Sequence, residues 1–429
     1  MGARKLWNAL GPGILLAAAS VGASHLVLSP QAGSLFGFEL LWLVLVAHLV
    51  KYPAFEFGPR YAAATGRHLL DGYARIPGPG RWAVVVFLVG TLVQGVGVLS
   101  AVMSIAGSVL STWTHCLGME WFSTILAAAI VGLLFAGGFS WMDHLNKIMM
   151  AGLALATLLA FVPILPGPET LRHLVVPGVP AGSLILVAAI LSWMPTGIDV
   201  SVWHSFWTLE KLRARSAGAA DTSKTARVEH LRTSLWDMRA GYLLSLLSGV
   251  MFMTMGAVHL AGRGKELQDV QFAEALSTAY TAVLGPWMYH VFMLTAFFAM
   301  FSTSYTVIDG FSRSFAESCA VLSPRASGAG ARKRVYHGFV IASALLACLI
   351  LVLVGKPDTL VKAAALVSLA TAPLLYAFNL YCVTHHIDEP QWRPSAANVC
   401  LACFGVVLMF VALVAMAYFE LPRILNPPA

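Results

Sequence analysis

The chain has 429 residues, of which 58% are hydrophobic and only 11% are charged. A soluble domain carries about 25% charged residues, so this composition excludes a soluble globular protein. We predict an all-α integral membrane protein, because the apolar runs approach the roughly 20 residues of a spanning helix and the short alternating segments of a barrel are absent.

Eleven apolar segments are predicted to span the membrane. In chain order they cover residues 13–35, 39–64, 82–111, 121–137, 144–165, 182–208, 236–262, 285–312, 334–355, 359–385 and 397–420. The polar stretch 209–235, rich in Ala, Ser, Arg and Lys, is predicted to be an exposed loop. No segment indicates a soluble domain, so residues 1–429 are expected to form a single transmembrane domain.

The distribution of basic residues predicts the orientation. When the N-terminus is placed in the cytoplasm, most Arg and Lys residues between spans fall on the cytoplasmic side, among them Arg67, Arg213 and Arg332. Few fall outside, such as Arg172 and Lys356. This imbalance satisfies the positive-inside rule and explains the net charge of +7 without a nucleic-acid partner. We therefore predict a multi-pass protein of the cell membrane with a cytoplasmic N-terminus and an extracytoplasmic C-terminus.

Polar and flexible residues interrupt the first predicted span between Ser20 and Ser29. Gly22, Ser24 and His25 lie there in an otherwise apolar segment. Backbone polar groups cannot stay open in hydrocarbon, so an interruption at this depth indicates a cavity lined by protein or water. We interpret this stretch as one half of a substrate site.

The sixth span is interrupted in the same way at 191–199. Pro195 removes a backbone donor, Gly197 loosens the chain, and Asp199 places a carboxylate near membrane depth. Spans one to five and six to ten then form two repeats of opposite topology, approximately residues 8–165 and 180–386, with 397–420 as an extra helix. Discontinuous helices at corresponding positions of inverted repeats indicate a secondary transporter.

Several motifs resemble those of the Nramp family of metal transporters. They are Gly11-Pro12, residues 32–42, Thr65-Gly66-Arg67-His68-Leu69, Gly95-Val96-Gly97, Gly138-Phe139-Ser140-Trp141 and Met194-Pro195. The resemblance follows chain order over nearly the whole length. It implies a LeuT-type fold, with a ten-helix inverted-repeat core, discontinuous helices one and six and an eleventh helix. In the family, this fold imports divalent metals together with protons.

The metal-binding motifs of the family are replaced in this chain. The first-helix motif Asp-Pro-Gly-Asn, whose Asp and Asn bind metal, is here Gly22-Ala23-Ser24-His25. The sixth-helix motif Met-Pro-His-Asn is Met194-Pro195-Thr196-Gly197, which keeps only the methionine ligand position. Acidic third-helix positions linked to proton movement appear as Thr91 and Gln94. The resemblance therefore implies the fold, and the substrate does not follow from it.

The predicted substrate-binding residues cluster around the two interruptions. They are Ser20, Gly22, Ala23, Ser24, His25, Leu191, Met194, Thr196 and Gly197. A divalent cation needs anionic or strongly basic ligands to offset its dehydration, and the first-helix carboxylate is missing. Hydroxyls and free amides at half-helix N-termini suit a small anion, such as bicarbonate or a small carboxylate, or a neutral polar solute.

The predicted coupling or pathway residues are Lys51, Thr91, Gln94, Asp199 and His204. Lys51 lies in the middle of the second span, where it either pairs with Asp199 or another carboxylate or acts as the cationic element of an anion pathway. Asp199 either accepts a proton or cation or caps local amides. His204 is either a proton carrier on the exit path or a core histidine.

Other residues near the interruptions also have two interpretations. His25 either satisfies carbonyls freed by the interruption or contacts the substrate or the coupling proton. Met194 is either a soft metal ligand or a packing residue, and Trp193 and Trp203 are packing residues or gate walls. The hydroxyl-rich run 302–306 either lines the path or satisfies helix packing.

The sequence leaves two functions open. The first is secondary-active, proton-coupled transport of a small anion or polar solute. The alternative is import of a divalent metal of the manganese or magnesium type, through a rebuilt site of His25, Met194 and Asp199. A receptor is disfavoured because no signalling domain is present, and no paired catalytic residues indicate an enzyme. The expected partners are the substrate, a coupling proton or cation and the lipid bilayer, with no cofactor and no nucleic acid.

Overall fold

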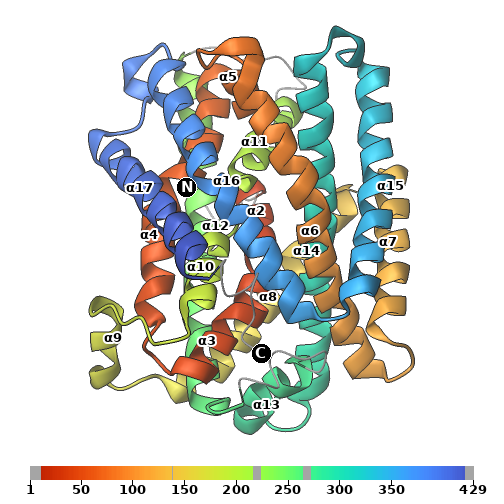
Figure 1. The fold of residues 1–429 in the computed structure, drawn as a ribbon, viewed down its shortest axis with the longest axis vertical. Coiled ribbons are helices and arrows are strands. Elements are labelled where there is room, and N and C mark those ends of the chain that lie inside the picture. The colour runs from red at the N-terminus through yellow and green to blue at the C-terminus, as the bar shows by residue number, and fades with distance from the viewer. Residues whose placement is uncertain (1–10, 138, 216–223, 264–271, 421–429) are drawn as a thin grey trace.

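The structure is a computed structural model that describes residues 11–137, 139–215, 224–263 and 272–420. Those residues form helices and connections, with no β-strand among them. Most long helices run along the long axis of the molecule, with the short helix α5 (Leu69–Tyr73) at one end and α9 (Arg172–Val175) and α13 (Phe272–Leu284) at the other (Figure 1). Strongly apolar sequences with few charges produce this bundle, as predicted.

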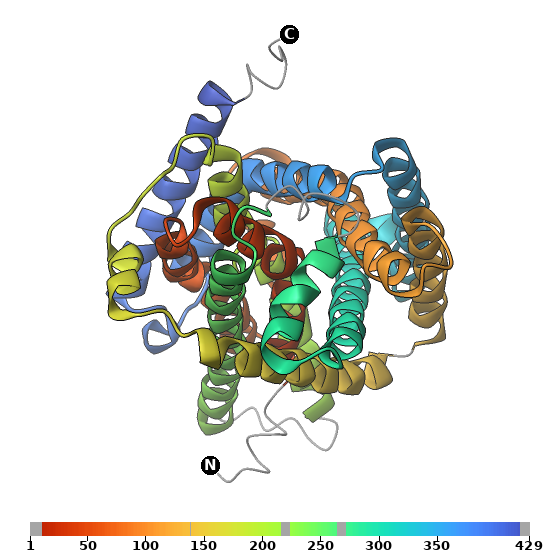
Figure 2. The ribbon, with the colours of Figure 1, turned by 90° about the horizontal axis from the view of Figure 1, so that it is seen from below.

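Within the described ranges, nine long helices form the body of the bundle. They are α4 (Leu41–Thr65), α6 (Trp82–Thr114), α7 (Met119–Ala136), α8 (Phe139–Phe161), α12 (Lys224–His259), α14 (Met288–Leu322), α15 (Ala329–Val354), α16 (Pro357–His385) and α17 (Ala396–Phe419). Short 3-10 turns occupy several connections: η2 (Pro79–Arg81), η3 (Val162–Ile164), η4 (Pro168–Leu171), η6 (Pro324–Ala326) and η7 (Pro390–Trp392). Helices α6, α7, α14 and α15 stand together on one side, and α17 lies on the opposite side against α4 and α16 (Figures 1 and 2).

Two further spans consist of half-helices. The first is α2 (Pro12–Ser20), followed by a π-helical segment η1 (Ser24–Leu28) and α3 (Ser29–Phe36), with a bend of 40°. The other is α10 (Leu184–Trp193) followed by α11 (Val200–Arg215). Both interruptions lie where the sequence predicts them, so spans one and six are discontinuous.

In the part of the chain that the structure describes, nine of the eleven predicted spans coincide with candidate membrane spans. Within the described residues, eight helices are long and apolar enough to cross a membrane, and the bent pair of half-helices makes a ninth. The two remaining predicted spans contain shorter apolar helices, at Ala151–Ile164 and Leu184–Trp193. The chain is therefore a multi-pass membrane protein.

The prediction of an exposed loop at 209–235 is wrong for most of its length. Helix α11 continues to Arg215 and α12 already begins at Lys224, and residues 216–223 lie outside the described residues. The helical parts of this stretch contain neither glycine nor proline and are rich in Leu, Lys, Arg and Glu, which favour helix even in water. The low hydropathy of this stretch therefore indicates where the helices leave the membrane. It does not indicate where the helices end.

Close backbone contact fixes the first half-helix on α12. A Cβ atom at Gly13 would collide with the carbonyl of Asp237, and one at Gly241 would collide with the carbonyl of Gly13. The Asp237 carboxylate accepts hydrogen bonds from the amides of Gly11 (3.1 Å) and Gly13 (3.0 Å), with the Lys211 ammonium 3.5 Å away. A carboxylate at a helix N-terminus is stabilised by the free amides and the helix dipole.

We predict that Gly241→Val destabilises the protein because its side chain would separate α12 from α2. Overpacking of this kind costs about 1–3 kcal/mol. Gly132→Val is the matched control, since nothing lies within 4 Å of a Cβ atom at Gly132. The melting temperature of the purified protein in detergent should fall for the first variant only, and equal values would contradict the close contact.

Candidate functional site

The first interruption is a short unwound turn between α2 and η1. The amide of Gly22 donates to the Ser20 carbonyl (2.8 Å), and the Gly22 carbonyl in turn accepts from the amides of His25 (3.1 Å) and Leu26 (2.9 Å). Gly22 lies against α14, where an added Cβ atom would approach the Thr303 side chain to 2.9 Å. The lack of a side chain at Gly22 thus permits the interruption to pack on α14.

The second interruption is satisfied by a lysine from another helix. Helix α10 ends at Trp193, and the chain is extended at Met194 before a cis peptide bond to Pro195. The ammonium of Lys51, on α4, donates to the carbonyls of Leu191 (3.2 Å), Ser192 (2.6 Å) and Thr196 (2.6 Å). The first two are carbonyls of the last turn of α10, which an ending helix leaves without partners, and the third belongs to the interruption itself.

Lys51 uses its whole hydrogen-bonding capacity in this contact. An ammonium has three N–H donors and no acceptor, and each donor has a carbonyl partner. The side chain is fully buried, and in the described part of the chain no carboxylate lies within ion-pair distance of it. The predicted ion pair with Asp199 is therefore not observed. Lys51 instead complements the negative end of the α10 dipole.

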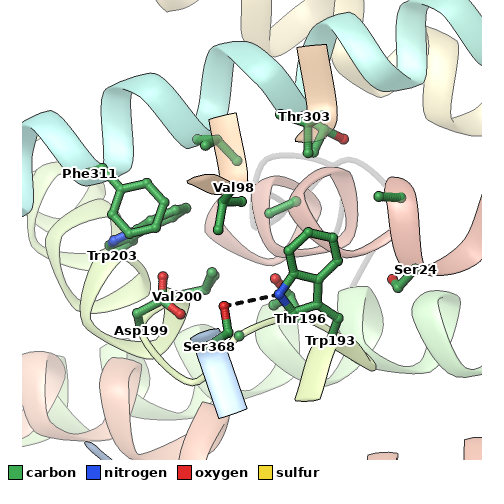
Figure 3. Close-up of a pocket in the computed structure, with 15 residues that line it drawn as sticks. Ser24, Val98, Trp193, Thr196, Asp199, Val200, Trp203, Thr303, Phe311 and Ser368 are labelled. Carbon is green, nitrogen blue, oxygen red and sulfur yellow. Dashed lines mark hydrogen bonds between the residues drawn. The ribbon is translucent and has the colours of Figure 1, made fainter. Parts of the chain in front are cut away.

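A small cavity of about 40 Å³ lies between the two interruptions. Half-helices α2, α10 and α11 surround it together with α6, α14 and α16, and Figure 3 shows its lining side chains. Its polar side chains are Ser24, Trp193, Thr196, Asp199, Thr303 and Ser368. Its other walls are glycine, aliphatic and aromatic residues: Ala19, Ala23, Val98, Val102, Gly197, Val200, Trp203, Val307 and Phe311. The volume is sufficient for a few water molecules or a small solute.

Asp199 is the one charged side chain among the described residues that line this cavity. It immediately precedes α11 and is 5% exposed. In the described residues, no other residue donates a hydrogen bond or ion pair to its carboxylate. Since buried carboxylates are normally paired, this unpaired one is available to a ligand or a proton.

A hydrogen-bonded chain from α6 to α10 orders one wall. The Gln94 side chain accepts from the Ser368 hydroxyl (2.7 Å) and donates to the Thr371 hydroxyl (2.9 Å). The Trp193 indole N–H donates to the same Ser368 hydroxyl at 3.1 Å (Figure 3). Gln94 therefore does not line the cavity itself, but it holds Ser368, which does. Thr91 is buried on α6 but does not line the cavity.

His25 points away from the cavity and joins three helices. Its Nδ1 lies 2.9 Å from the Ser24 hydroxyl, and its Nε2 lies 2.9 Å from the Ser245 carbonyl on α12. The Ser245 hydroxyl lies 3.1 Å from Nε2 of His48 on α4, whose Nδ1 contacts the Val44 carbonyl at 2.8 Å. A carbonyl only accepts, so Nε2 of His25 and Nδ1 of His48 are the donors to these carbonyls, and the Ser245 hydroxyl can donate to Nε2 of His48. This arrangement favours the structural interpretation of His25.

Four of the predicted substrate-binding residues line the cavity: Ala23, Ser24, Thr196 and Gly197. The others do not, namely Ser20, Gly22, His25, Leu191 and Met194. Of the predicted coupling residues only Asp199 lines it, and Lys51, Thr91, Gln94 and His204 lie behind or beyond it. His204 is fully buried, with no hydrogen-bond partner for either ring nitrogen among the described residues.

Most lining residues that the sequence did not single out come from uninterrupted helices, whereas Ala19 and Val200 belong to half-helices α2 and α11. Val98, Val102, Val307, Phe311 and Ser368 belong to uninterrupted apolar segments and carry no local signal. Thr303 belongs to the run for which lining the path was one of two predictions, and it does line the cavity. Trp193 and Trp203 form walls, as one of their interpretations stated.

The structure does not assemble the alternative metal site. His25 and Met194 do not line the cavity with Asp199, and the Met194 sulfur instead contacts the Ser29 hydroxyl at 3.9 Å. Across the described ranges, no group of three or more His, Cys, Asp or Glu residues could hold a metal ion.

The two interrupted spans and the central cavity between them belong to a LeuT-type fold. A family model described as natural resistance-associated macrophage protein-like matches residues 13–419, so the chain belongs to the Nramp family, whose members are transporters. The chain is 28% identical over 388 residues to uncharacterized protein PM0681 of Pasteurella multocida, covering 87% of this chain and 84% of that protein. It is 26% identical over 267 residues to the divalent metal cation transporter MntH of Chromohalobacter salexigens, and the match covers 60% of this chain and 59% of that protein.

A solved structure confirms the fold. The manganese transporter of Eremococcus coleocola, in complex with an aromatic bis-isothiourea substituted compound, matches with a TM-score of 0.73 and 13% identity. The match covers 100% of this chain and 90% of that one. At this identity the likeness concerns the fold alone, and the fold prediction is confirmed.

We predict that Lys51→Met destabilises the protein, because it leaves buried carbonyls at the end of α10 without donors. Three buried carbonyls would lose their donor at about 1–3 kcal/mol each, so a loss of at least about 3 kcal/mol is expected. The matched control is Lys356→Met, which removes an exposed lysine. Thermal unfolding of the purified variants, followed by tryptophan fluorescence, measures the difference. A melting temperature of Lys51→Met equal to that of the control would rule out this role of Lys51.

Proposed function

We propose that this protein is a secondary-active, proton-coupled transporter of a small carboxylate or a similarly small polar solute. The observation that carries the proposal is the cavity lining, which consists of apolar walls, hydroxyls, backbone amides and a single carboxylate. Such a surface suits a small organic molecule or oxyanion with hydrogen-bonding groups better than a dehydrated divalent cation.

Backbone donors at the interruptions support an anionic or carbonyl-bearing ligand. Ala23 and Gly197 line the cavity, one from each interruption. Their amides donate to no acceptor among the described residues. Each lies just before a helical segment, where free amides and the helix dipole favour negative charge.

The charges near the cavity support proton coupling. A substrate carboxylate beside an ionised Asp199 would be repelled, so Asp199 would take a proton when the anion binds. The ammonium of Lys51 adds a fixed positive charge directly behind the cavity wall, because it donates to the carbonyl of the lining residue Thr196. Lys51 thus acts on the site through its field rather than by direct contact.

Import of a divalent metal is the second candidate, since relatives by sequence and by fold are named as metal transporters. Against it, Asp199 alone of the three proposed ligands lines the cavity. We also propose that the N-terminus is cytoplasmic and that the chain is one transmembrane domain of two inverted repeats, on the positive-inside rule and the paired interruptions.

Uptake into proteoliposomes tests the proposal. With an inward proton gradient, we expect accumulation of radiolabelled bicarbonate or of a small carboxylate from a panel, above that of protein-free liposomes. Manganese, cadmium and magnesium are tested in parallel with a dye inside the vesicles. Robust metal uptake without accumulation of any anion or polar solute would overturn the proposal in favour of the metal candidate.

Asp199→Asn should abolish proton-driven accumulation while substrate exchange across the membrane continues. The amide keeps the shape of the side chain but cannot carry the coupling proton, so accumulation should fall at least about tenfold, as for loss of a proton-transfer group. Asp388→Asn, at an exposed position, is the control and should behave as the wild type. Full accumulation by Asp199→Asn would exclude Asp199 as the coupling group.

A further inference from the structure

A second, larger cavity lies at the end of the molecule where α5 and the α14–α15 connection are found, uppermost in Figure 1. Its volume is about 480 Å³, and its lining comes from the α4–α5 connection, α5, η2, α11, α14 and α15. A smaller cavity of about 280 Å³ shares His68, Leu209, Arg213, Glu317 and Arg332 with it. We call the larger one the arginine vestibule.

Among the described residues, five arginines and two carboxylates line the arginine vestibule, and together they carry a net charge of +3 when His68 is neutral. The arginines are Arg67, Arg75, Arg81, Arg213 and Arg332, and the carboxylates are Asp71 and Glu317. Charges of one sign gathered around one hollow raise the local concentration of ions of the other sign.

Two of the arginines already have partners in the protein. Arg332 forms an ion pair with Glu317 at 3.2 Å, which removes that carboxylate as a partner for the others. Arg81 donates to the carbonyl of Val321. In the described residues, the side chains of Arg67, Arg75 and Arg213 have no hydrogen bond or ion pair. Three guanidinium groups from separate segments therefore remain available around the same cavity.

We propose that the arginine vestibule binds a phosphate-bearing anion, independently of the transported substrate. Guanidinium groups present planar pairs of donors that match phosphate oxygens, and several of them together suit a ligand with more than one negative charge. The positive-inside rule explains basic residues on this face, but it does not require three unpaired ones to converge on a cavity from different elements. The source is either a soluble phosphate compound or the headgroup of an anionic lipid.

Binding at this position would connect a half-helix to the surrounding helices. Arg213 is on α11, which also carries Asp199 and Trp203 to the central cavity. Arg67 and Arg75 are in the α4–α5 connection and directly after α5. An anion held by all three would bridge α11 to α4 and α5, and so restrain the half-helix that forms one wall of the central cavity.

Titration of the full-length protein with pyrophosphate tests the proposal. The protein is placed in nanodiscs of phosphatidylcholine alone, and binding is measured by calorimetry at low salt. We expect Arg75→Gln/Arg213→Gln to bind about 100-fold more weakly, at about tenfold for each lost charge-assisted contact. Arg325→Gln is the matched control, because Arg325 is exposed nearby and does not line the vestibule. Arg75→Lys/Arg213→Lys keeps the charge and should show an intermediate loss, which gives a readout if the glutamine variant does not fold.

Nanodiscs that contain phosphatidylglycerol distinguish the two sources. A rise in melting temperature with this lipid that requires Arg75 and Arg213, and that pyrophosphate reduces, assigns the site to a lipid headgroup. Pyrophosphate binding without any lipid effect assigns it to a soluble anion. The proposal is overturned if neither probe acts, or if Arg325→Gln weakens binding as much as the double variant. Transport is not measured, so the result is separate from the proposed substrate.

Discussion

The central cavity depends on the capping of α10 by Lys51. A helix that ends inside a membrane leaves carbonyls with no water to bind, and such groups are costly in hydrocarbon. Lys51 meets this need from α4 with three hydrogen bonds, two of them at 2.6 Å. The interruption between α10 and α11 can therefore be stable only while α4 and α10 keep their relative positions. The buried ammonium of Lys51 thus stabilises the end of α10, and the position of that end determines where the cavity forms.

The two interruptions are supported by different helices. The first is tied to α12, through His25 and Ser245 beside the interruption and through Asp237 at the start of α2. The second is tied to α4, through Lys51. A displacement of α2 would exchange its contacts with α12 for water, whereas a displacement of α10 would expose unsatisfied carbonyls. The two interruptions therefore rely on hydrogen bonds to two different helices, although both line the same cavity.

The sequence predicted the discontinuous spans well, because glycine, proline and polar residues are rare at mid-depth in a spanning helix. It also pointed to Lys51, since a charge at that depth is expensive. Its partners could not be predicted, because the acceptors are backbone carbonyls about 140 residues away, and a carbonyl carries no side-chain signal. Ser24 and His25 are adjacent and both polar, and only the turn at Gly22 decides that Ser24 lines the cavity while His25 contacts α12. Ser368 and Phe311 lay in uninterrupted apolar helices and had no pattern to distinguish them.

The contacts of Gly22 show that more than one residue separates this site from the metal site of the family. Gly22 stands where the resemblance places a metal-binding aspartate, and restoring that side chain would bring it against Thr303, at 2.9 Å from an added Cβ atom. Thr303 is held in place, because its hydroxyl donates to the carbonyls of Ala18 (2.8 Å) and Ala299 (2.9 Å). The space for a first-helix carboxylate is thus filled by α14, and Asp199 supplies negative charge from the other interruption. We therefore expect that Gly22→Asp alone would not create a metal-binding geometry in this protein.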